Sequence, residues 1–293
     1  MIQEPITQTR RVVLGVLSMI VLIGSYGFFS HKVHVENPDD TTIPTWSQMG
    51  EGVKMAITPD KIGNLKFKRM LAEGETFNKA QEVWVKFRLS WLYQDTIATM
   101  GRLLAGMGVG IILAFVFGVL MGSYPSFEAF FSVNWMLFSR MVPTAMLAIF
   151  FNLVGTGTAM YITMIAFGIV PNLALSICLE AKAIPSELKY KTYTLGATSS
   201  EAIWDLVVKQ ILPRMMELFR LAIGPALVYL IAAELICGDV GMGYRIRNLS
   251  RRLDMSVVYP YILILAGYGF LLERALLGIQ KKLCPWYNLK EKL

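Results

Sequence analysis

The stretch "KTYTLGATSSEAIWDLVVKQILP", residues 191–213, decides how the rest of the sequence is interpreted. It carries charged residues, a Gly-Ala step and the apolar spacing of an amphipathic helix. Two strongly apolar stretches, 157–180 and 215–237, flank it. Because a polar segment of this kind does not belong in hydrocarbon, we expect it to join two membrane-spanning helices on one side of a bilayer.

The remaining sequence is that of a membrane protein. The chain has 293 residues, of which 55% are hydrophobic, and a helix of about 20 apolar residues crosses a bilayer. Six stretches are predicted to do so: 12–30, 97–122, 134–154, 157–180, 215–237 and 257–279. In the second of them, glycines four residues apart (106 and 110, 118 and 122) predict close helix packing. The fold class expected is an all-α membrane protein with six transmembrane helices.

The first apolar stretch has two interpretations. Arg10 and Arg11 precede a run of apolar residues, which is also the pattern of a secretory signal. The run is long for a signal core, and no A-x-A cleavage pattern follows it. We therefore expect a retained anchor helix over 1–30.

Basic residues predict the orientation. With a cytoplasmic N-terminus, the cytoplasmic segments carry eleven Lys and Arg, and the short outer loops carry four. Because Lys and Arg are enriched in cytoplasmic loops, both termini are predicted to be cytoplasmic. The net charge of +7 then follows largely from topology, and no nucleic-acid partner is expected.

Residues 31–95 are predicted to lie outside. The segment has nine basic and nine acidic residues and ends in "KAQEVWVKFRLSWLYQD". Aromatic residues on such a helix favour an interfacial position leading into the next span. A docking surface for a partner protein is the alternative.

Sequence motifs of catalysis are lacking. There is no P-loop, no H-E-x-x-H and no G-x-S-x-G pattern, and His31 and His34 alone make a weak metal site. No enzymatic activity, cofactor or metal is expected of this chain.

Residues 190–213 resemble the coupling segment of ABC importer permeases. That family has E-A-A, three residues, Gly, nine residues and I-x-L-P; here Gly196 and Ala197 match it. The sequence departs at both ends of the motif. The E-A-A positions hold Tyr190, Lys191 and Thr192. The I, L and P positions of I-x-L-P hold Leu206, Val208 and Lys209.

The flanking segments carry the resemblance further, to the nitrate/sulfonate/taurine/bicarbonate-type branch. "RMVPTAMLAIFFNLVGTGTAMYI" is similar to the R-P-x-P-x-x-A stretch of the branch, and "LIAAELICGDVGMGYRI" to its A-A-E and G-x-G-Y segments. Arg102 matches in "WLYQDTIATMGRLLAG". The resemblance covers about 92–287, with the order and spacing kept.

The resemblance implies a type I ABC importer permease fold in a bacterial inner membrane. It implies a second permease chain, identical or paralogous, two ATPase subunits that bind ATP and Mg, and an external solute-binding protein. The solute would be a small anion such as nitrate, a sulfonate, taurine or bicarbonate. The expected domains are an anchor (1–30), an outer segment (31–95), a core (96–287) with a coupling helix at about 185–209, and a tail (288–293).

The resemblance and the polar residues in the spans together give the candidate site residues. The surface that couples to the ATPase is expected to include Lys191, Thr192, Leu195, Gly196, Ala197, Ile203, Trp204 and Leu206. Intramembrane polar residues usually face a bundle interior or an aqueous path, which makes the pathway candidates Arg140, Pro143, Asn152, Asn172 and Glu234. The alternatives are structural: residues 191–209 could form a solvated loop helix, Glu217 and Arg220 could pair, and Glu234 could brace a neighbouring helix.

Four arginines, Arg245, Arg247, Arg251 and Arg252, break the positive-inside trend. We expect a short helix after Gly238, Gly241 and Gly243 that carries them to the outer mouth, where they would attract an anion. Contacts with lipid headgroups or with the binding protein are the alternative.

Two rival classes remain open. A secondary transporter would rest on discontinuous helices and ion-coupling carboxylates; a membrane-embedded enzyme would need a catalytic cluster. An ATPase that accompanies the chain would distinguish the permease from both.

Overall fold

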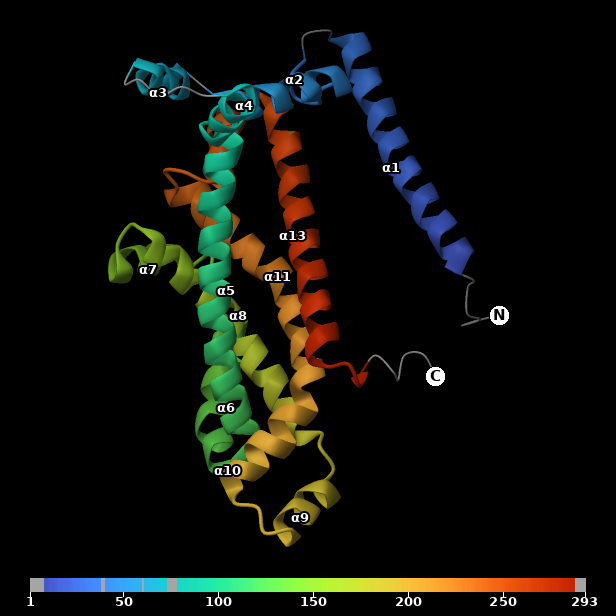
Figure 1. The fold of residues 1–293 in the computed structure, drawn as a ribbon, viewed down its shortest axis with the longest axis vertical. Helices are drawn as coiled ribbons and strands as arrows, with labels where there is room; N and C mark the ends of the chain where they lie inside the picture. The colour runs from blue at the N-terminus through green and yellow to red at the C-terminus, as the bar shows by residue number, and fades with distance from the viewer. Residues whose placement is uncertain (1–7, 38–39, 60, 73–77, 288–293) are drawn as a thin grey trace. The chain divides into compact units, whose positions relative to one another are not determined.

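A computed structural model of the chain describes residues 8–37, 40–59, 61–72 and 78–287, and these residues are helical with short connections (Figure 1). The chain divides into two compact units. One is Met1–Tyr93 with Ile246–Leu263; the other is Gln94–Arg245 with Ile264–Leu293. The predicted tail 288–293 lies outside the described residues.

The first unit is built around α1 (Gln8–Glu36), which extends six residues beyond the predicted anchor. The outer segment that follows is more helical than expected. It forms α2 (Trp46–Ile57), α3 (Lys61–Ala72) and α4 (Lys79–Arg88). Reciprocal capping boxes start α2 at Thr45 and α4 at Asn78, because each side chain accepts a backbone N–H that the helix leaves unpaired.

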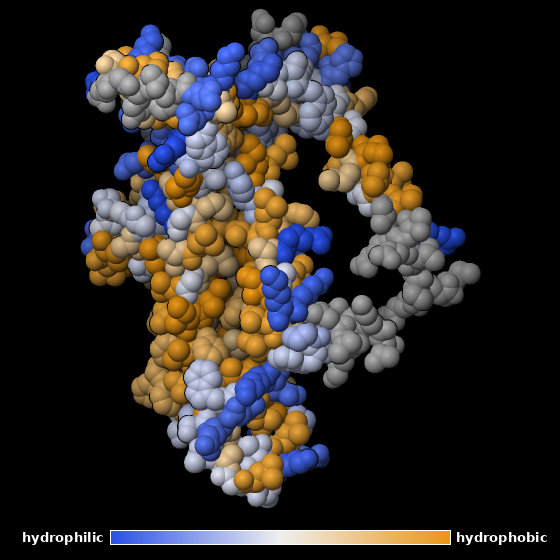
Figure 2. Space-filling view, viewed as in Figure 1, coloured by the Kyte–Doolittle hydropathy of each residue, from blue (hydrophilic) through white to orange (hydrophobic). Residues whose placement is uncertain are grey.

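The second unit contains most of the long helices. These are α5 (Trp91–Ser123), which begins at the end of the first unit, α6 (Pro125–Arg140), α7 (Leu147–Val154), α8 (Thr158–Lys182), α11 (Lys209–Cys237) and most of α13 (Met255–Leu283). Three short elements, α9 (Ser186–Thr194), α10 (Ser199–Glu201) and the π-helix η1 (Ala202–Val208), connect α8 to α11. Buried side chains of α5, α8 and α11 form its hydrophobic core. Apolar surface covers the middle of these long helices (Figure 2).

Glycines let α5 approach α8 closely, as their spacing predicts. A Cβ atom at Gly118 would lie 2.7 Å from the Cβ atom of Ile177, and one at Gly122 would lie 2.5 Å from that of Ala181. Gly106 and Gly110 face α8 at similar distances. The prediction of small-residue packing is therefore confirmed, with α8 as the partner helix.

Five helices in the described residues are long and apolar enough to cross a membrane, whereas the sequence predicted six spans. The five lie in Val13–Glu36, Trp91–Ser123, Thr158–Lys182, Ser199–Cys237 and Met255–Leu283. The sixth, predicted over 134–154, is not one helix, because α6 ends at Arg140 and α7 begins at Leu147. Pro143 explains the break. It has no N–H to donate and disfavours helical backbone at the residue before it, and the chain is already extended at Met141.

Candidate functional site

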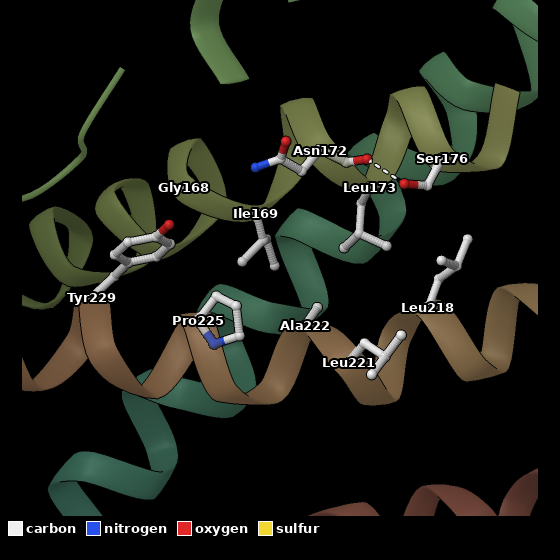
Figure 3. A pocket seen from close by; sticks show the side chains of 10 residues that line it. All are labelled: Gly168, Ile169, Asn172, Leu173, Ser176, Leu218, Leu221, Ala222, Pro225 and Tyr229. Atoms are coloured by element: carbon white, nitrogen blue, oxygen red, sulfur yellow. Dashed lines mark hydrogen bonds between the residues drawn. The ribbon is translucent and has the colours of Figure 1, made fainter. Parts of the chain in front are cut away.

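A cavity of about 240 Å³ lies between α8 and α11 (Figure 3). Residues four apart on each helix form its walls, because residues at this spacing share one helical face. Helix α8 contributes Gly168, Ile169, Asn172, Leu173 and Ser176, and α11 contributes Leu218, Leu221, Ala222, Pro225 and Tyr229. The cavity corresponds to the liquid volume of about eight water molecules, which is the scale of a small solute.

Three side chains bring polar atoms to these largely apolar walls: Asn172, Ser176 and Tyr229 (Figure 3). The Ser176 hydroxyl donates a hydrogen bond of 2.8 Å to the backbone carbonyl of Asn172. That bond stays within α8 and leaves the Asn172 amide group in the lining of the cavity. A few polar groups in an apolar wall are typical of a small-molecule site.

The predicted pathway residues occupy several different places. Asn172 lines the cavity. Pro143 is buried, and its ring comes within 3.2 Å of where a Cβ atom at Gly168 would lie. Arg140, at the end of α6, and Asn152, on α7, are exposed and outside the lining of the cavity. Glu234 is also outside it. The structure therefore brings Asn172 and Pro143 to the cavity region and does not bring the other three residues there.

Glu234 lies in a buried polar network near the end of α11. Its carboxylate accepts hydrogen bonds of 2.9 Å from the Arg102 guanidinium and of 3.0 Å from the Thr99 hydroxyl. The Glu234 side chain is 0% exposed, and that of Arg102 is 15% exposed. Arg102 also lies over the ring of Tyr161, 4.2 Å from its centre. Glu234 thus braces α11 against α5, which agrees with the structural alternative for this residue.

Asp95 anchors the other half of the network. Its carboxylate accepts a hydrogen bond of 2.9 Å from the guanidinium of Arg245 and one of 3.1 Å from the backbone N–H of Gly241. Asp95 is 0% exposed. Arg245 was predicted to be available at the outer mouth; the ion pair with Asp95 instead gives it a structural partner.

The predicted helix after the three glycines is present as α12 (Met242–Arg251). Of the four arginines assigned to the outer mouth, Arg251 and Arg252 are exposed, and Arg247 is partly buried. Arg251 and Arg252 are therefore the two that present charge to solvent.

The segment between α8 and α11 is two helical pieces rather than the single coupling helix predicted at about 185–209. Helix α9 ends at Thr194, and Gly196 then takes a φ of 84°. The Gly196 N–H donates to the Tyr193 carbonyl, and the Ala197 N–H to the Thr192 carbonyl. This is the pattern of a Schellman cap, in which a left-handed glycine ends the helix. A capping box between Thr198 and Glu201 then starts the next helix.

Apolar side chains project from this connecting segment. Leu195 is 80% exposed and Trp204 is 61% exposed, and Tyr190 and Tyr193 on α9 are exposed as well. Of the other predicted coupling residues, Lys191 and Gly196 are exposed, and Thr192, Ala197 and Leu206 are half-buried. Ile203 was expected to face a partner, but it packs partly against the hydrophobic core of its own unit.

Another sequence expectation concerns a possible pair on α11. Glu217 and Arg220 do not pair with each other. Glu217 accepts hydrogen bonds from Arg214 at 3.0 Å and from the Tyr287 hydroxyl at 2.9 Å, and Arg220 lies 3.5 Å from Glu273 of α13. These contacts tie the start of α11 to the C-terminal part of the chain.

Sequence reasoning missed Asp95 and Thr99 as site residues. A signal was present, because Asp95, Thr99 and Arg102 follow one another at spacings of four and three residues and so share one face of α5. Tyr190 and Tyr193 were also missed as part of the exposed apolar surface.

Comparisons with known proteins agree with this architecture. The family described as "Binding-protein-dependent transport system inner membrane component" matches residues 109–283. The taurine transport system permease protein TauC of Escherichia coli (strain K12) is 26% identical over 197 residues, which are 67% of this chain and 72% of that protein. The bicarbonate transport system permease protein CmpB of Synechocystis sp. is 23% identical over 195 residues, 66% of this chain and 70% of that protein.

The fold has a counterpart among solved structures. A chain of the MetNI methionine ABC transporter, in an inward-facing conformation, superposes with a TM-score of 0.59 at 16% identity, covering 64% of this chain and 94% of that chain. This likeness confirms the permease fold that the sequence predicted. Because the family match spans more than half of the sequence, this chain belongs to the inner membrane components of binding-protein-dependent transport systems.

Proposed function

We propose that this chain is the permease subunit of an ATP-driven importer in a bacterial inner membrane. Two such chains, identical or paralogous, would form one pathway, and an external binding protein would deliver the solute. Two separate ATPase subunits would bind ATP and Mg on the cytoplasmic side. The single observation that carries the proposal is the cavity between α8 and α11, with polar groups from Asn172, Ser176 and Tyr229 between two membrane-spanning helices.

Exposed apolar side chains on the segment that connects α8 to α11 in sequence support a docked partner. Leu195 is exposed in the turn that follows α9, and Trp204 is exposed in the first turns of the continuous helix Ser199–Cys237. Covering such surface gains about 25 cal/mol per Å² of apolar area. Together with the two tyrosines, Tyr190 and Tyr193, this surface has the chemistry of an interface core, where aromatic residues are enriched. We assign it to the ATPase.

The two carboxylates that are buried in the described part of the chain, Glu234 and Asp95, argue against the rival secondary transporter. An ion-coupled carrier needs a carboxylate that can exchange its ion during the cycle. Glu234 is held by Arg102, and Asp95 by Arg245, and both carboxylates accept further hydrogen bonds. Each carboxylate already has a fixed cationic partner, so neither is suited to ion exchange.

The solute proposed is a small anion. The named relatives include permeases for taurine and bicarbonate, both of which carry an acidic group. Arg251 and Arg252 add positive charge at the end of α12 and directly after it. Charges in a low-dielectric entrance raise the local concentration of an oppositely charged solute.

Purification from the native host in mild detergent tests the ATPase partnership. A tagged chain should bring with it a protein with a P-loop motif, and Trp204→Glu should lose that protein while remaining folded. Ser186→Glu, in the first turn of α9, is the matched control, because an acidic residue there suits the helix dipole. Purification of the wild-type chain without any ATPase, together with uptake insensitive to ATP depletion, would exclude the proposal.

A further inference from the structure

Side chains of two other helices, α5 and α11, cap the start of α12. Three successive backbone N–H groups at this end each donate to a different side chain. Gly241 donates to Asp95 at 3.1 Å, Met242 to Thr99 at 2.9 Å, and Gly243 to Glu234 at 2.9 Å. The first N–H groups of a helix have no partner within the helix, so these bonds satisfy groups that would otherwise be buried and unpaired. Two of the three acceptors are carboxylates, the charge that a helix N-terminus favours.

The acceptors are fixed by their own helices and by cations. Asp95 and Thr99 lie one turn apart on α5, and Glu234 lies three residues before the end of α11. Arg245 binds the first carboxylate and Arg102 the second. Asp95, Thr99 and Glu234 are all 0% exposed. The ends of α5, α11 and α12 thus share one closed set of charges and hydrogen bonds.

The contact of the first turn of α12 with α5 and α11, called the capped joint below, is also sterically tight. A Cβ atom at Gly241 would lie 2.6 Å from a carboxylate oxygen of Glu234, and one at Gly243 would lie 2.7 Å from the Glu234 Cβ atom. Gly241 also has a φ of 131°, which L side chains rarely adopt. A shift of the α12 backbone toward Glu234 would therefore bring it into that side chain.

The interface between α8 and α11 around the cavity has a different character. Its walls are mostly apolar, and the space between them is open to the surface, because Asn172 and Leu221 are exposed. Removing one partner from a buried ion pair is strongly destabilising, since it leaves a charge without compensation. Apolar surfaces in contact have no such directional requirement. A change of register therefore costs more at the capped joint, where it leaves buried charges and backbone N–H groups unpaired, than among the apolar side chains of the cavity walls.

We propose that Asp95, Thr99 and Glu234 are positioning residues that hold the first turn of α12 at one place on α5 and α11, so that these three helix ends move as one body while the pathway opens along α8. They act through the backbone of residues 241–243 and have no contact with the solute. The proposal rests on the proposed function, because it concerns motion during an ATP-driven cycle.

Distances between spin labels test whether α5 and the start of α12 move together, with Asp95, Thr99 and Glu234 left unchanged. Cys178, Cys237 and Cys284 are replaced by Ala, and labels are placed at Leu104 on α5 and at Val240 just before α12, which are both exposed. Labelled chains are mixed with excess unlabelled chains, so that a complex contains one labelled pair. A second pair, at Asn172 and Leu221, spans the cavity. Complexes with ATPase and binding protein are measured without nucleotide and after trapping with ATP and vanadate.

The joint predicts that the 104–240 distance stays within about 2 Å between these states, the scale of small helix shifts. The 172–221 distance should change by more than that. A 104–240 distance that changes as much as the cavity pair would overturn the proposal.

A matched pair of variants tests the hydroxyl that links two members of the network. Thr99→Val keeps the shape but removes the acceptor for Met242 and the donor to Glu234, and Thr99→Ser keeps both functions. In assembled complexes, Thr99→Val should broaden the 104–240 distance distribution and raise ATP hydrolysed per solute transported by about fivefold or more, because a buried hydrogen-bonding group is left unpaired. Thr99→Ser should resemble the wild type in both readouts.

A merely structural role would lower the amount of folded complex and leave the ratio of hydrolysis to transport unchanged in what assembles. An unchanged ratio together with an unchanged distance distribution in Thr99→Val would therefore contradict the proposal. Asp95→Asn, which retains an acceptor for Gly241 and loses the charge that binds Arg245, gives the same test if Thr99→Val does not assemble. Failure of the proposed function would instead appear as absence of ATP-dependent transport in the unlabelled wild-type complex.

Discussion

The ring of Tyr229 lies so close to Gly168 that a Cβ atom at residue 168 would sit 2.3 Å from two carbons of that ring. The glycine lets an aromatic side chain of α11 lie directly on the backbone of α8. Both residues line the cavity, so this contact sets how far the two helices stand apart at one end of it (Figure 3).

Gly168→Ala should therefore displace Tyr229 and narrow the cavity. Inserting a methyl group into a packed contact costs about 1–3 kcal/mol, and we expect ATP-dependent uptake to fall by about tenfold if the ring moves into the pathway. Uptake is measured in proteoliposomes, with the amount of assembled complex determined separately. Gly224→Ala, on α11 with nothing within 4 Å of the added atom, is the control and should transport normally. Equal uptake by both variants would show that this contact does not bound the pathway.

Gly118→Ala tests the packing of α5 on α8. The added atom would meet the Ile177 side chain at 2.7 Å and the Ala174 carbonyl at 2.9 Å. We expect a loss of about 1–3 kcal/mol of stability, seen as a lower midpoint of thermal unfolding in detergent. Gly108→Ala has open space and should instead be neutral or stabilising by up to about 1 kcal/mol, since alanine favours helix. If the two variants have the same midpoint, the close approach is not supported.

The sequence predicted the features that depend on local spacing. Glycines four apart on α5 specified a close helix contact, and the three glycines after Glu234 specified the end of α11 and the start of α12. Apolar run length located five of the spans. These features follow from the helix repeat and from backbone freedom at glycine, which neighbouring residues determine.

Other features depend on partners far apart in the chain. Asp95 binds Arg245, and Thr99 binds Glu234, at separations of 150 and 135 residues. Periodicity places Asp95 and Thr99 on one face of α5 and cannot say what that face meets. The break at Pro143 was missed because apolar residues predominate on both sides of it, so the length of the apolar run did not reveal the turn. The coupling segment was expected as a helix over about 185–209 with a Gly-Ala turn inside it; that the turn ends one helix depends on the positive φ of Gly196, which the apolar pattern does not report.

The exposed apolar surface of the connecting segment gives a prediction about coupling. Leu195→Glu and Trp204→Glu should leave the fold intact, because both side chains are largely exposed. They should release the ATPase or uncouple hydrolysis from uptake, since a charge would be buried at the interface. Gly196→Asp should act more severely, because it also strains the left-handed backbone by about 1–3 kcal/mol. Unchanged co-purification and unchanged ATPase activity in all three variants would remove the docking surface from this segment.

Topology is accessible through single cysteines. Ser47→Cys should react with a membrane-impermeant maleimide in spheroplasts, and Thr194→Cys only after permeabilisation, because the Lys and Arg asymmetry predicts that these positions lie on opposite sides. Cys178 and Cys237 are replaced by Ala. The remaining native thiol, Cys284, gives little background at neutral pH, because burial raises its pKa; its labelling should increase as the pH rises. Labelling of Thr194→Cys in sealed spheroplasts would reverse the assignment.

Arg251→Gln/Arg252→Gln tests attraction of an anionic solute. The pair is exposed, so the substitutions should not destabilise the chain. If these charges act on the solute, uptake should fall while affinity for the binding protein holds, and the dependence of uptake on salt should flatten, since salt screens charges beyond about 8 Å at physiological ionic strength. Uptake that falls only in step with binding-protein affinity would assign the arginines to docking.

Uptake by the reconstituted wild-type complex tests the central claim most directly. Proteoliposomes contain this chain and its co-purifying ATPase, with ATP inside and the binding protein outside loaded with labelled bicarbonate or with a labelled sulfonate such as taurine. The account predicts accumulation that requires ATP and the binding protein and that Trp204→Glu abolishes. Accumulation that proceeds without ATP and follows an imposed ion gradient would contradict it.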